Sequence, residues 1–260
     1  MRKVRGSIPR APTKLKTLTL PNLRKELRSK ANPRKAEILQ RFFKTGKGEY
    51  GEGDIFLGIQ SPDKRKIAKK YKNLRFSDLR QLLKSKIHDE RETALLILIN
   101  RFQGAMTRHS TSVRHKIFNL YLKNTKYINN WDLVDLSAPK IVGEYLRQFG
   151  IINETKRILY RLAKSKNIWE RRIAILATYA FIQNNKFDEA LEISEMLLGD
   201  SHDLIHKAVG WMLREVGKRS QKTLERFLKK HYKKMSRTAL RYAIERFPEK
   251  KRKLYLNGKI

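Results

Sequence analysis

The sequence predicts an all-α protein organised as a solenoid of degenerate two-helix repeats, and two observations support this fold class. From about residue 22 onward, good helix formers dominate and apolar residues recur at spacings of three and four, as in Leu79, Leu82 and Leu83. Short segments also recur along the chain, each with charged residues just before a small-residue apolar helix. Alternating β-branched residues are scarce, which argues against strands.

The recurring segments are DERETAL (89–95), WERRIAI (169–175), HKAVGW (206–211) and SRTAL (236–240). Aligned on their small residues, with one unit near Ser137, they are offset by roughly 43, 37, 35 and 30 residues, a drifting period typical of helical repeats. The short side chains of Ala94, Ala174, Ala208 and Ala239 would let neighbouring helices approach closely. A stacked solenoid has a concave face, which suits a rod-shaped ligand such as duplex DNA.

Three regions follow from the composition along the chain. Residues 1–21 are basic and proline-containing and show no apolar period, so we expect a mostly disordered arm. Residues 22–250 form the helical-repeat domain, and 251–260 form a basic C-terminal tail. The main interruption, 44–58, holds five of the 13 glycines. We expect a helix–helix loop there, because no GxxxxGK[ST] pattern supports a phosphate loop.

The net charge of +35 points to a polyanionic partner, most simply a nucleic acid bound on a basic concave face. The other interpretation is a solvated, lysine-rich surface, and an acidic membrane fits less well. The chain has no cysteine, and its six histidines do not cluster, so we expect no disulfide, metal or cofactor. No signal-peptide pattern or membrane-length apolar run is present, which predicts a soluble, cytoplasmic protein. We expect a monomer.

The motif WDLVD (131–135) is the strongest candidate for chemistry. On a helix, Trp131 and Asp135 share a face, and an aromatic ring beside a carboxylate makes a receptor for a cation. In so basic a protein, the cation is expected to arrive within a nucleic acid. Trp169 and Trp211 occur in the next repeats, and Arg172 stands three residues after Trp169, so all could converge on the concave face. Alternatively, Trp131 is a core residue and Asp135 a solvated or capping carboxylate.

Four segments in order, 41–59, 129–135, 167–176 and 207–215, resemble the signatures of the AlkD-type DNA alkylation repair family. The resemblance covers about residues 25–250. It implies a HEAT-like repeat fold and a DNA glycosylase that excises cationic alkylpurines from duplex DNA without base flipping. It also implies that Asp135 is the catalytic carboxylate, that Trp131 and Trp211 lie beside the lesion, and that Arg172 contacts DNA.

Physical reasoning agrees with this implication. An N-alkylated purine is already a cationic leaving group, so one carboxylate can suffice to stabilise the sugar cation and orient water. A charge pair at about 4 Å and an effective dielectric near 20 is worth roughly 4 kcal/mol, on the order of a thousandfold in rate. Trp131 and Trp211 would each add about 0.5–2 kcal/mol by cation–π contact. The planar fork of Arg172 suits a phosphate.

Further residues are expected to contact DNA. Some relatives of this type have a tyrosine as a third aromatic wall, and here either Phe42 or Tyr50 could take its place. Asp132, three residues before Asp135, is expected to cap or pack the repeat. The remaining candidates for DNA contact are Trp169, Arg171, Lys207 and Arg214. Together the basic residues predict an affinity that falls steeply with salt.

Two alternatives to a monofunctional glycosylase stay open. One is a non-catalytic protein of the same architecture that binds duplex or branched nucleic acid. The other is a basic protein-interaction scaffold. The combination of Asp135, Trp131 and Arg172 favours the enzyme.

Overall fold

The computed structural model describes residues 18–107 and 110–260, and within these ranges every regular element is a helix. The only β pairing there is an isolated bridge between Ile55 and Ile87. The all-α class predicted from the apolar spacing is therefore confirmed.

The helices follow one another with short connections. In chain order they are α1 (Leu20–Arg28), α2 (Pro33–Phe42), α3 (Ser61–Lys70), α4 (Phe76–Leu83), α5 (His88–Thr107), α6 (Thr111–Leu122), the 3-10 turn η1 (Thr125–Tyr127), α7 (Trp131–Ala138), the π-helical η2 (Pro139–Gly143), α8 (Glu144–Phe149), α9 (Ile152–Ala163), α10 (Ile168–Ala177), α11 (Tyr179–Ile182), α12 (Asp188–Met196), α13 (Asp203–Arg219), α14 (Gln221–His231), the 3-10 turn η3 (Tyr232–Lys234), α15 (Arg237–Ala243) and α16 (Glu249–Leu256).

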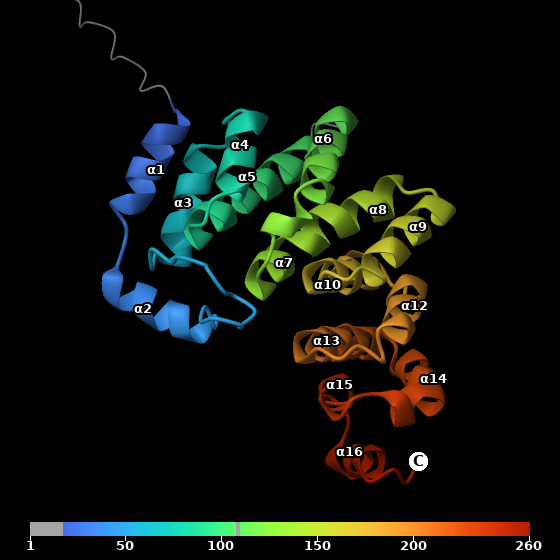
Figure 1. Ribbon diagram of the computed structural model, residues 1–260. Helices are drawn as coiled ribbons and strands as arrows, with labels where there is room; N and C mark the ends of the chain where they lie inside the picture. Colours follow the sequence, from blue (N-terminus) through green and yellow to red (C-terminus); the bar gives the residue numbers. More distant parts are fainter. Residues whose placement is uncertain (1–17, 108–109) are drawn as a thin grey trace, which may run out of the picture.

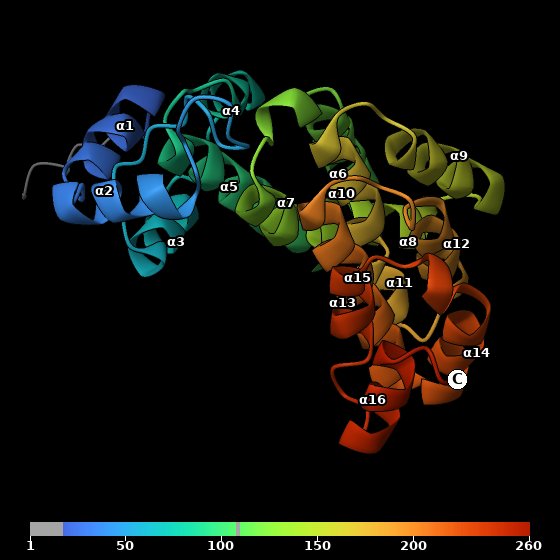
Figure 2. The ribbon, with the colours of Figure 1, turned by 60° about the horizontal axis from the view of Figure 1, so that its bottom comes forward.

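The helices are stacked in the order of the sequence, and the stack bends (Figure 1). The first helices and the last ones form its two arms, while α7, α10, α13 and α15 succeed one another along the inner side of the bend (Figure 2). Neighbouring members of that series pack directly on each other. Residues far apart in sequence are therefore presented side by side on this inner surface.

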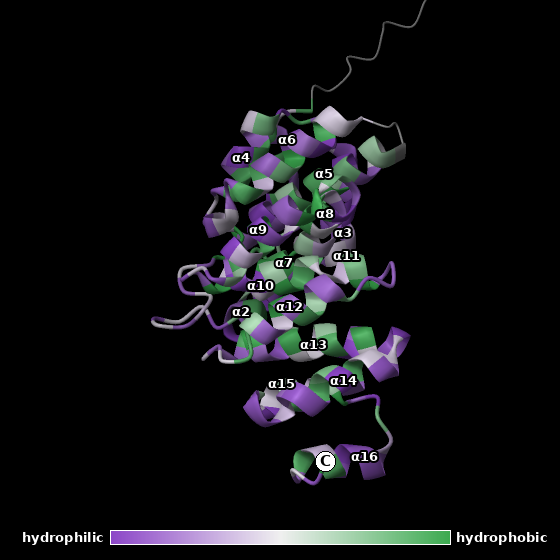
Figure 3. Cartoon of the chain, turned by 90° about the vertical axis from the view of Figure 1, so that its right-hand side faces the viewer, coloured by the Kyte–Doolittle hydropathy of each residue, from purple (hydrophilic) through white to green (hydrophobic). Residues whose placement is uncertain are grey.

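The core runs through the whole stack as one continuous cluster of apolar side chains. Residues 94–99 of α5 and 173–177 of α10 are buried, and so are the small residues Ala208 and Ala239. Hydrophobic and hydrophilic residues share the same helices, as Figure 3 shows, and most of the described helices bury one side against their neighbours, whereas α2 has no buried residue. The close approach expected from the small residues is consistent with this burial.

A π-helical segment follows the helix that begins at Trp131. Pro139 follows α7 directly and has no backbone N–H to donate, and the chain continues as the π-helical η2 before α8. Gly143 ends η2 against α10, where an added Cβ would lie 2.2 Å from the carbonyl oxygen of Ala177. Only glycine lets the two backbones come this close.

The glycine-rich segment 44–58 connects α2 to α3 as a loop, as its composition predicted. Asp54, almost fully buried, accepts a 2.6 Å hydrogen bond from Arg91 of α5. The backbone N–H of Leu57 donates to Asp89 at 2.7 Å. These bonds fasten the loop to the start of α5 and carry Tyr50 toward α7 and α10.

The expected region boundaries differ in detail from the helices. Residues 1–17 of the basic arm lie outside the described residues, and α1 begins at Leu20, two positions before the expected domain start. The segment expected as a tail is helical as far as Leu256, and Tyr255 within it is 2% exposed because it packs on Phe247 and Tyr232. Apolar residues among the lysines extend the folded chain beyond the expected border. No described helix combines the length and apolarity needed to span a bilayer.

Candidate active site

Two asparagines start the helices that carry the central candidates. The Asn130 side chain accepts a hydrogen bond from the backbone N–H of Trp131 at 2.8 Å, and that of Asn167 accepts one from Trp169 at 2.9 Å. Such caps satisfy N–H groups that have no partner inside the helix. The same local signal therefore fixes the starts of α7 and α10, which pack on each other.

The packing of α7 on α10 joins Asp135 to Arg172. Nε and Nη2 of Arg172 donate to the two carboxylate oxygens of Asp135, each at 2.8 Å. The Arg172 side chain is 6% exposed, whereas that of Asp135 keeps 19%. Nη1 of Arg172 also donates to the carbonyl oxygen of Leu204 on α13. The arginine thus connects α7, α10 and α13 and fixes the orientation of the carboxylate.

This arrangement differs from the role predicted for Arg172. Its planar fork was expected on a DNA phosphate, but here it holds a carboxylate and is almost fully buried. A phosphate contact by the same two nitrogens would require Arg172 to leave Asp135.

Burial governs the protonation of Asp135. Removal from water raises the pKa of its carboxyl group, the Arg172 guanidinium opposes that rise, and nearby Asp132 adds to it, with a net shift upward. The carboxylate is therefore held in place by a cation but weakly solvated. Such a group responds strongly to a second positive charge placed against its exposed part.

A cavity of about 530 Å³ meets that exposed part of Asp135. Its lining includes Trp211 from α13, Tyr179 from α11 and Lys140 from η2. The Trp211 and Tyr179 rings lie 6.4 Å apart, and the indole Nε1 donates to Glu215 at 3.2 Å. Asp135 and Trp211, 76 residues apart in the sequence, thus share one cavity with both aromatic and carboxylate walls.

Trp131 belongs to an aromatic cluster at the other end of α7. Its ring stacks on Phe43 at 5.1 Å and meets the edge of Phe42 at 6.0 Å. Its Nε1 donates to the Tyr50 hydroxyl at 3.3 Å, and the Tyr50 ring lies 6.1 Å from that of Trp169. The glycine-rich loop therefore brings Tyr50 between two of the three tryptophans.

Both aromatic candidates for the third wall contact Trp131, but they differ in burial. Phe42 is 61% exposed, whereas Tyr50 is packed against the core. Trp169 is 6% exposed, so most of its surface is already covered by the protein.

The sequence of this chain matches a known protein family over most of its length. The family model described as "DNA alkylation repair enzyme" matches residues 23–247. The chain belongs to this family. No curated protein matches the sequence.

Among solved structures, a predicted DNA alkylation repair enzyme from Enterococcus faecalis is similar, with a TM-score of 0.64 and 18% identity over 85% of this chain and 98% of that one. A protein from Streptococcus mutans UA159 is similar with a TM-score of 0.50 and 20% identity over 70% of this chain and 90% of that one. At these identities the two structures support the fold alone.

The basic residues predicted to contact DNA form ion pairs with carboxylates of the protein itself. Arg171 donates to both carboxylate oxygens of Asp200, at 2.6 and 3.3 Å, and is 18% exposed. Lys207 pairs with Asp203 at 2.7 Å and stays 42% exposed. Arg214 pairs with Glu245. Of these three, Lys207 is the most accessible to a phosphate.

Sequence reasoning missed several members of the site. Phe43, Tyr179 and Lys140 are absent from the predicted set, although Phe43 stands beside Phe42 and Lys140 is the second residue after the WDLVD helix. The neighbouring carboxylate, Asp132, accepts from its own helix at Leu133 and contacts His88 of α5 at 3.0 Å. This contact agrees with the packing role expected for it.

Proposed function

We propose that this protein is a monofunctional DNA N-glycosylase that excises cationic N3- or N7-alkylated purines from duplex DNA. Membership of the DNA alkylation repair enzyme family supports a role in alkylation repair. Beyond that role, we propose that the bond broken is the N-glycosidic bond and that the substrate is a cationic alkylpurine. Because such a base already carries a positive charge, it can leave without protonation, and it need not be flipped into a closed pocket to receive a proton.

The observation that carries the proposal is the carboxylate of Asp135, oriented by Arg172 and partly exposed in a cavity shared with Trp211. A cationic sugar or base against that exposed edge would meet a carboxylate and an indole together. Both attract positive charge, the first by Coulombic interaction and the second by cation–π contact.

In the proposed reaction, the bond between the sugar C1′ and the base nitrogen is largely broken before the bond from C1′ to water forms. Its electron pair stays on the base and neutralises the positive charge. Asp135 stabilises the oxocarbenium-like sugar and orients a water molecule, whose oxygen bonds to C1′ and whose proton is released. Arg172 acts as a positioning residue, because it holds both carboxylate oxygens and itself touches no reacting atom.

The test is base release from a duplex containing 7-methylguanine under single-turnover conditions. Wild-type protein should release the base, and Asp135→Asn should lower the rate on the order of a thousandfold. Asp188→Asn is the matched control, because Asp188 is an exposed residue in the first turn of α12. Absence of release by the wild type, or release unaltered by Asp135→Asn, would exclude the proposed reaction.

One observation favours a second function, non-catalytic binding of duplex or branched DNA. The Arg172 guanidinium partly neutralises Asp135, which weakens the attraction of the carboxylate for a sugar cation. A binding protein would hold the methylated duplex without releasing the base, and Asp135→Asn would leave its affinity unchanged. The same duplex therefore separates the two functions when binding and base release are both measured.

A further inference from the structure

A second cavity, of about 680 Å³, lies among α2, α3, α5 and α7. Phe43, which stacks on Trp131, forms part of its apolar wall together with Phe56. Its polar lining includes His88, Glu92 and Asp132. These three residues have no role in the proposed reaction.

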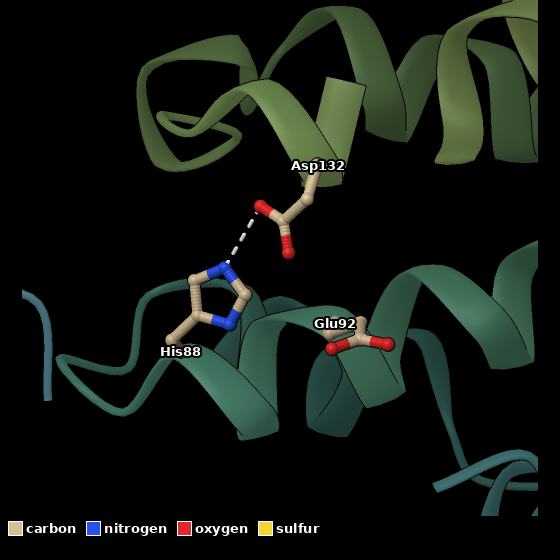
Figure 4. Close-up of side chains that lie close together, drawn as sticks. All are labelled: His88, Glu92 and Asp132. Carbon is tan, nitrogen blue, oxygen red and sulfur yellow. Dashed lines mark hydrogen bonds and ion pairs between the residues drawn. The ribbon is translucent and has the colours of Figure 1, made fainter. Parts of the chain in front are cut away.

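The three polar residues converge on a small volume (Figure 4). One potential ligand atom from each, an imidazole nitrogen of His88 and a carboxylate oxygen of Glu92 and of Asp132, all lie within 4.8 Å of one another. His88 and Glu92 come from successive turns of α5, and Asp132 faces them from α7. Imidazole and carboxylate groups at this spacing match the ligands of a divalent transition metal.

Only one of the two ring nitrogens of His88 has a hydrogen-bond partner among the described residues. His88 is 1% exposed, and its Nε2 lies 3.0 Å from Asp132. Its other ring nitrogen, Nδ1, has no hydrogen-bond partner among the described residues. In Figure 4 this second nitrogen is turned to the side where Glu92 lies. A buried polar atom without a partner is costly, and a bound cation would satisfy it.

The charges around the cluster are unbalanced. Asp89, Glu92 and Asp132 are three carboxylates, and Lys64 is the one cation of the described residues that pairs with any of them. These three carboxylates and one ammonium leave an excess of two negative charges among the four side chains. Lys35 also lines the cavity, but it is exposed and forms no ion pair with these groups. In a chain of net charge +35, a partly buried excess of negative charge is unexpected.

We propose that His88, Glu92 and Asp132 form a binding site for a divalent transition metal ion, with Zn²⁺ as the ligand we commit to. Zinc takes nitrogen and oxygen ligands at about 2.0–2.2 Å, so the three side chains would close in slightly on the ion. Three protein ligands would leave a fourth position for water. Two positive charges would offset the excess negative charge.

Lys64 is the built-in competitor of the metal. Its ammonium group contacts Glu92 and lies 3.6 Å from Asp89, and the side chain is 8% exposed. Metal binding would displace this ammonium from Glu92. The site would then link α5 to the first turn of α7, one residue after Trp131.

The experiment titrates Zn²⁺ into chelator-treated, full-length protein and follows the heat of binding and the melting temperature. The proposal expects uptake of one equivalent and a rise in melting temperature. Asp132→Asn keeps the shape of a side chain that is 22% exposed and should weaken Zn²⁺ at least tenfold. Asp188→Asn, an exposed acid in the first turn of α12, should bind Zn²⁺ as the wild type does.

Lys64→Met separates a metal site from an ordinary ion-pair network. Without the competing ammonium, a metal site should bind Zn²⁺ at least tenfold more tightly, and Zn²⁺ should restore the melting temperature lost by the substitution. A network of ion pairs would lose stability with no gain in Zn²⁺ affinity. That result, or equal uptake by the wild type and Asp132→Asn, would overturn the proposal, whatever the outcome of the base-release assay.

Discussion

Asp135 and Arg172 face each other across the α7–α10 contact through two hydrogen bonds of 2.8 Å, and the carboxylate is the more exposed partner. The pair combines two opposing effects on one group. Burial raises the pKa of Asp135, and the guanidinium restrains that rise. The pKa of the candidate catalytic group is therefore raised by its burial and held back by a residue on the neighbouring helix.

The first prediction concerns the pH dependence of base release. The reaction needs the carboxylate, so its rate should fall as pH falls through the raised pKa of Asp135. In Arg172→Gln the pKa of Asp135 should rise further, because the restraining charge is gone, and the fall should begin at higher pH. Single-turnover rates measured across the acidic range give the acidic limb of the pH–rate profile, and hence the pH at which the rate falls.

Arg171→Gln is the matched control for that profile. It removes the same charge from the same turn of α10, but from the pair with Asp200. Its acidic limb should coincide with that of the wild type. Equal displacement of the limb in both variants would mean that overall charge, and not the contact with Asp135, sets the profile.

The second prediction concerns stability. At neutral pH, Arg172→Gln leaves the Asp135 carboxylate in its buried position without its partner, at a cost of about 3–5 kcal/mol in unfolding free energy. A carboxyl group whose pKa is raised by folding contributes most stability below its unfolded pKa, and that contribution is lost as pH rises through the folded value. The deficit of Arg172→Gln should therefore be largest near neutral pH and shrink on acidification.

Urea unfolding of both proteins at neutral and at acidic pH measures this change. Arg171→Gln again serves as the comparison, since Asp200 has no part in the Asp135 site. A deficit for Arg172→Gln that grows as pH falls would reverse the predicted sign and refute the pKa argument.

How far the sequence predicts this structure depends on the range of the interaction. The helices and their buried faces follow from local signals, such as the apolar spacing of Leu79, Leu82 and Leu83, all fully buried. The position of Trp131 and Asp135 one turn apart on α7 is equally local. Both are properties of a few neighbouring residues, which periodicity and capping reveal.

The contacts between helices could not be predicted in this way. Arg172 reaches Asp135 across 37 positions, and the orientation of its fork depends on how α10 packs on α7. His88 and Asp132 are 44 positions apart, so their approach is not visible as a metal-binding spacing. Individual residue types suggest chemistry, but only the packing of the helices decides which groups meet.

The third prediction uses two glycines within helices. An added Cβ at Gly210 of α13 would lie 2.5 Å from both the carbonyl oxygen of Ala239 and the Cβ of Tyr242, whereas one at Gly104 of α5 meets no atom of the described residues within 4 Å. Gly210→Ala should therefore lower the unfolding free energy by about 1–3 kcal/mol through overpacking. Gly104→Ala should raise it by about 0.5–1 kcal/mol through helix propensity. Denaturant unfolding compares them, and a stabilising Gly210→Ala would show that α13 and α15 can separate freely.

The fourth prediction assigns separate roles to Phe42 and Tyr50. Phe42 is 61% exposed, so Phe42→Ala should change stability by no more than about 0.5 kcal/mol. If its face stacks on DNA, the substitution should cost about 1–3 kcal/mol in binding, roughly fivefold to a hundredfold in affinity. Tyr50 instead supports Trp131, because its hydroxyl accepts from the indole Nε1 at 3.3 Å. Tyr50→Phe should lower the unfolding free energy by about 1 kcal/mol.

Fluorescence anisotropy with a duplex and urea unfolding, applied to both variants, separate these roles. Phe42→Ala should lose affinity and keep stability, while Tyr50→Phe should lose stability and bind DNA with an affinity reduced less than that of Phe42→Ala. The reverse pattern would place the hydroxyl of Tyr50 on the DNA and make Phe42 the supporting ring. In that case the glycine-rich loop itself would contact DNA. Hydrogen bonds of Asp54 and Leu57 to α5 hold this loop in place.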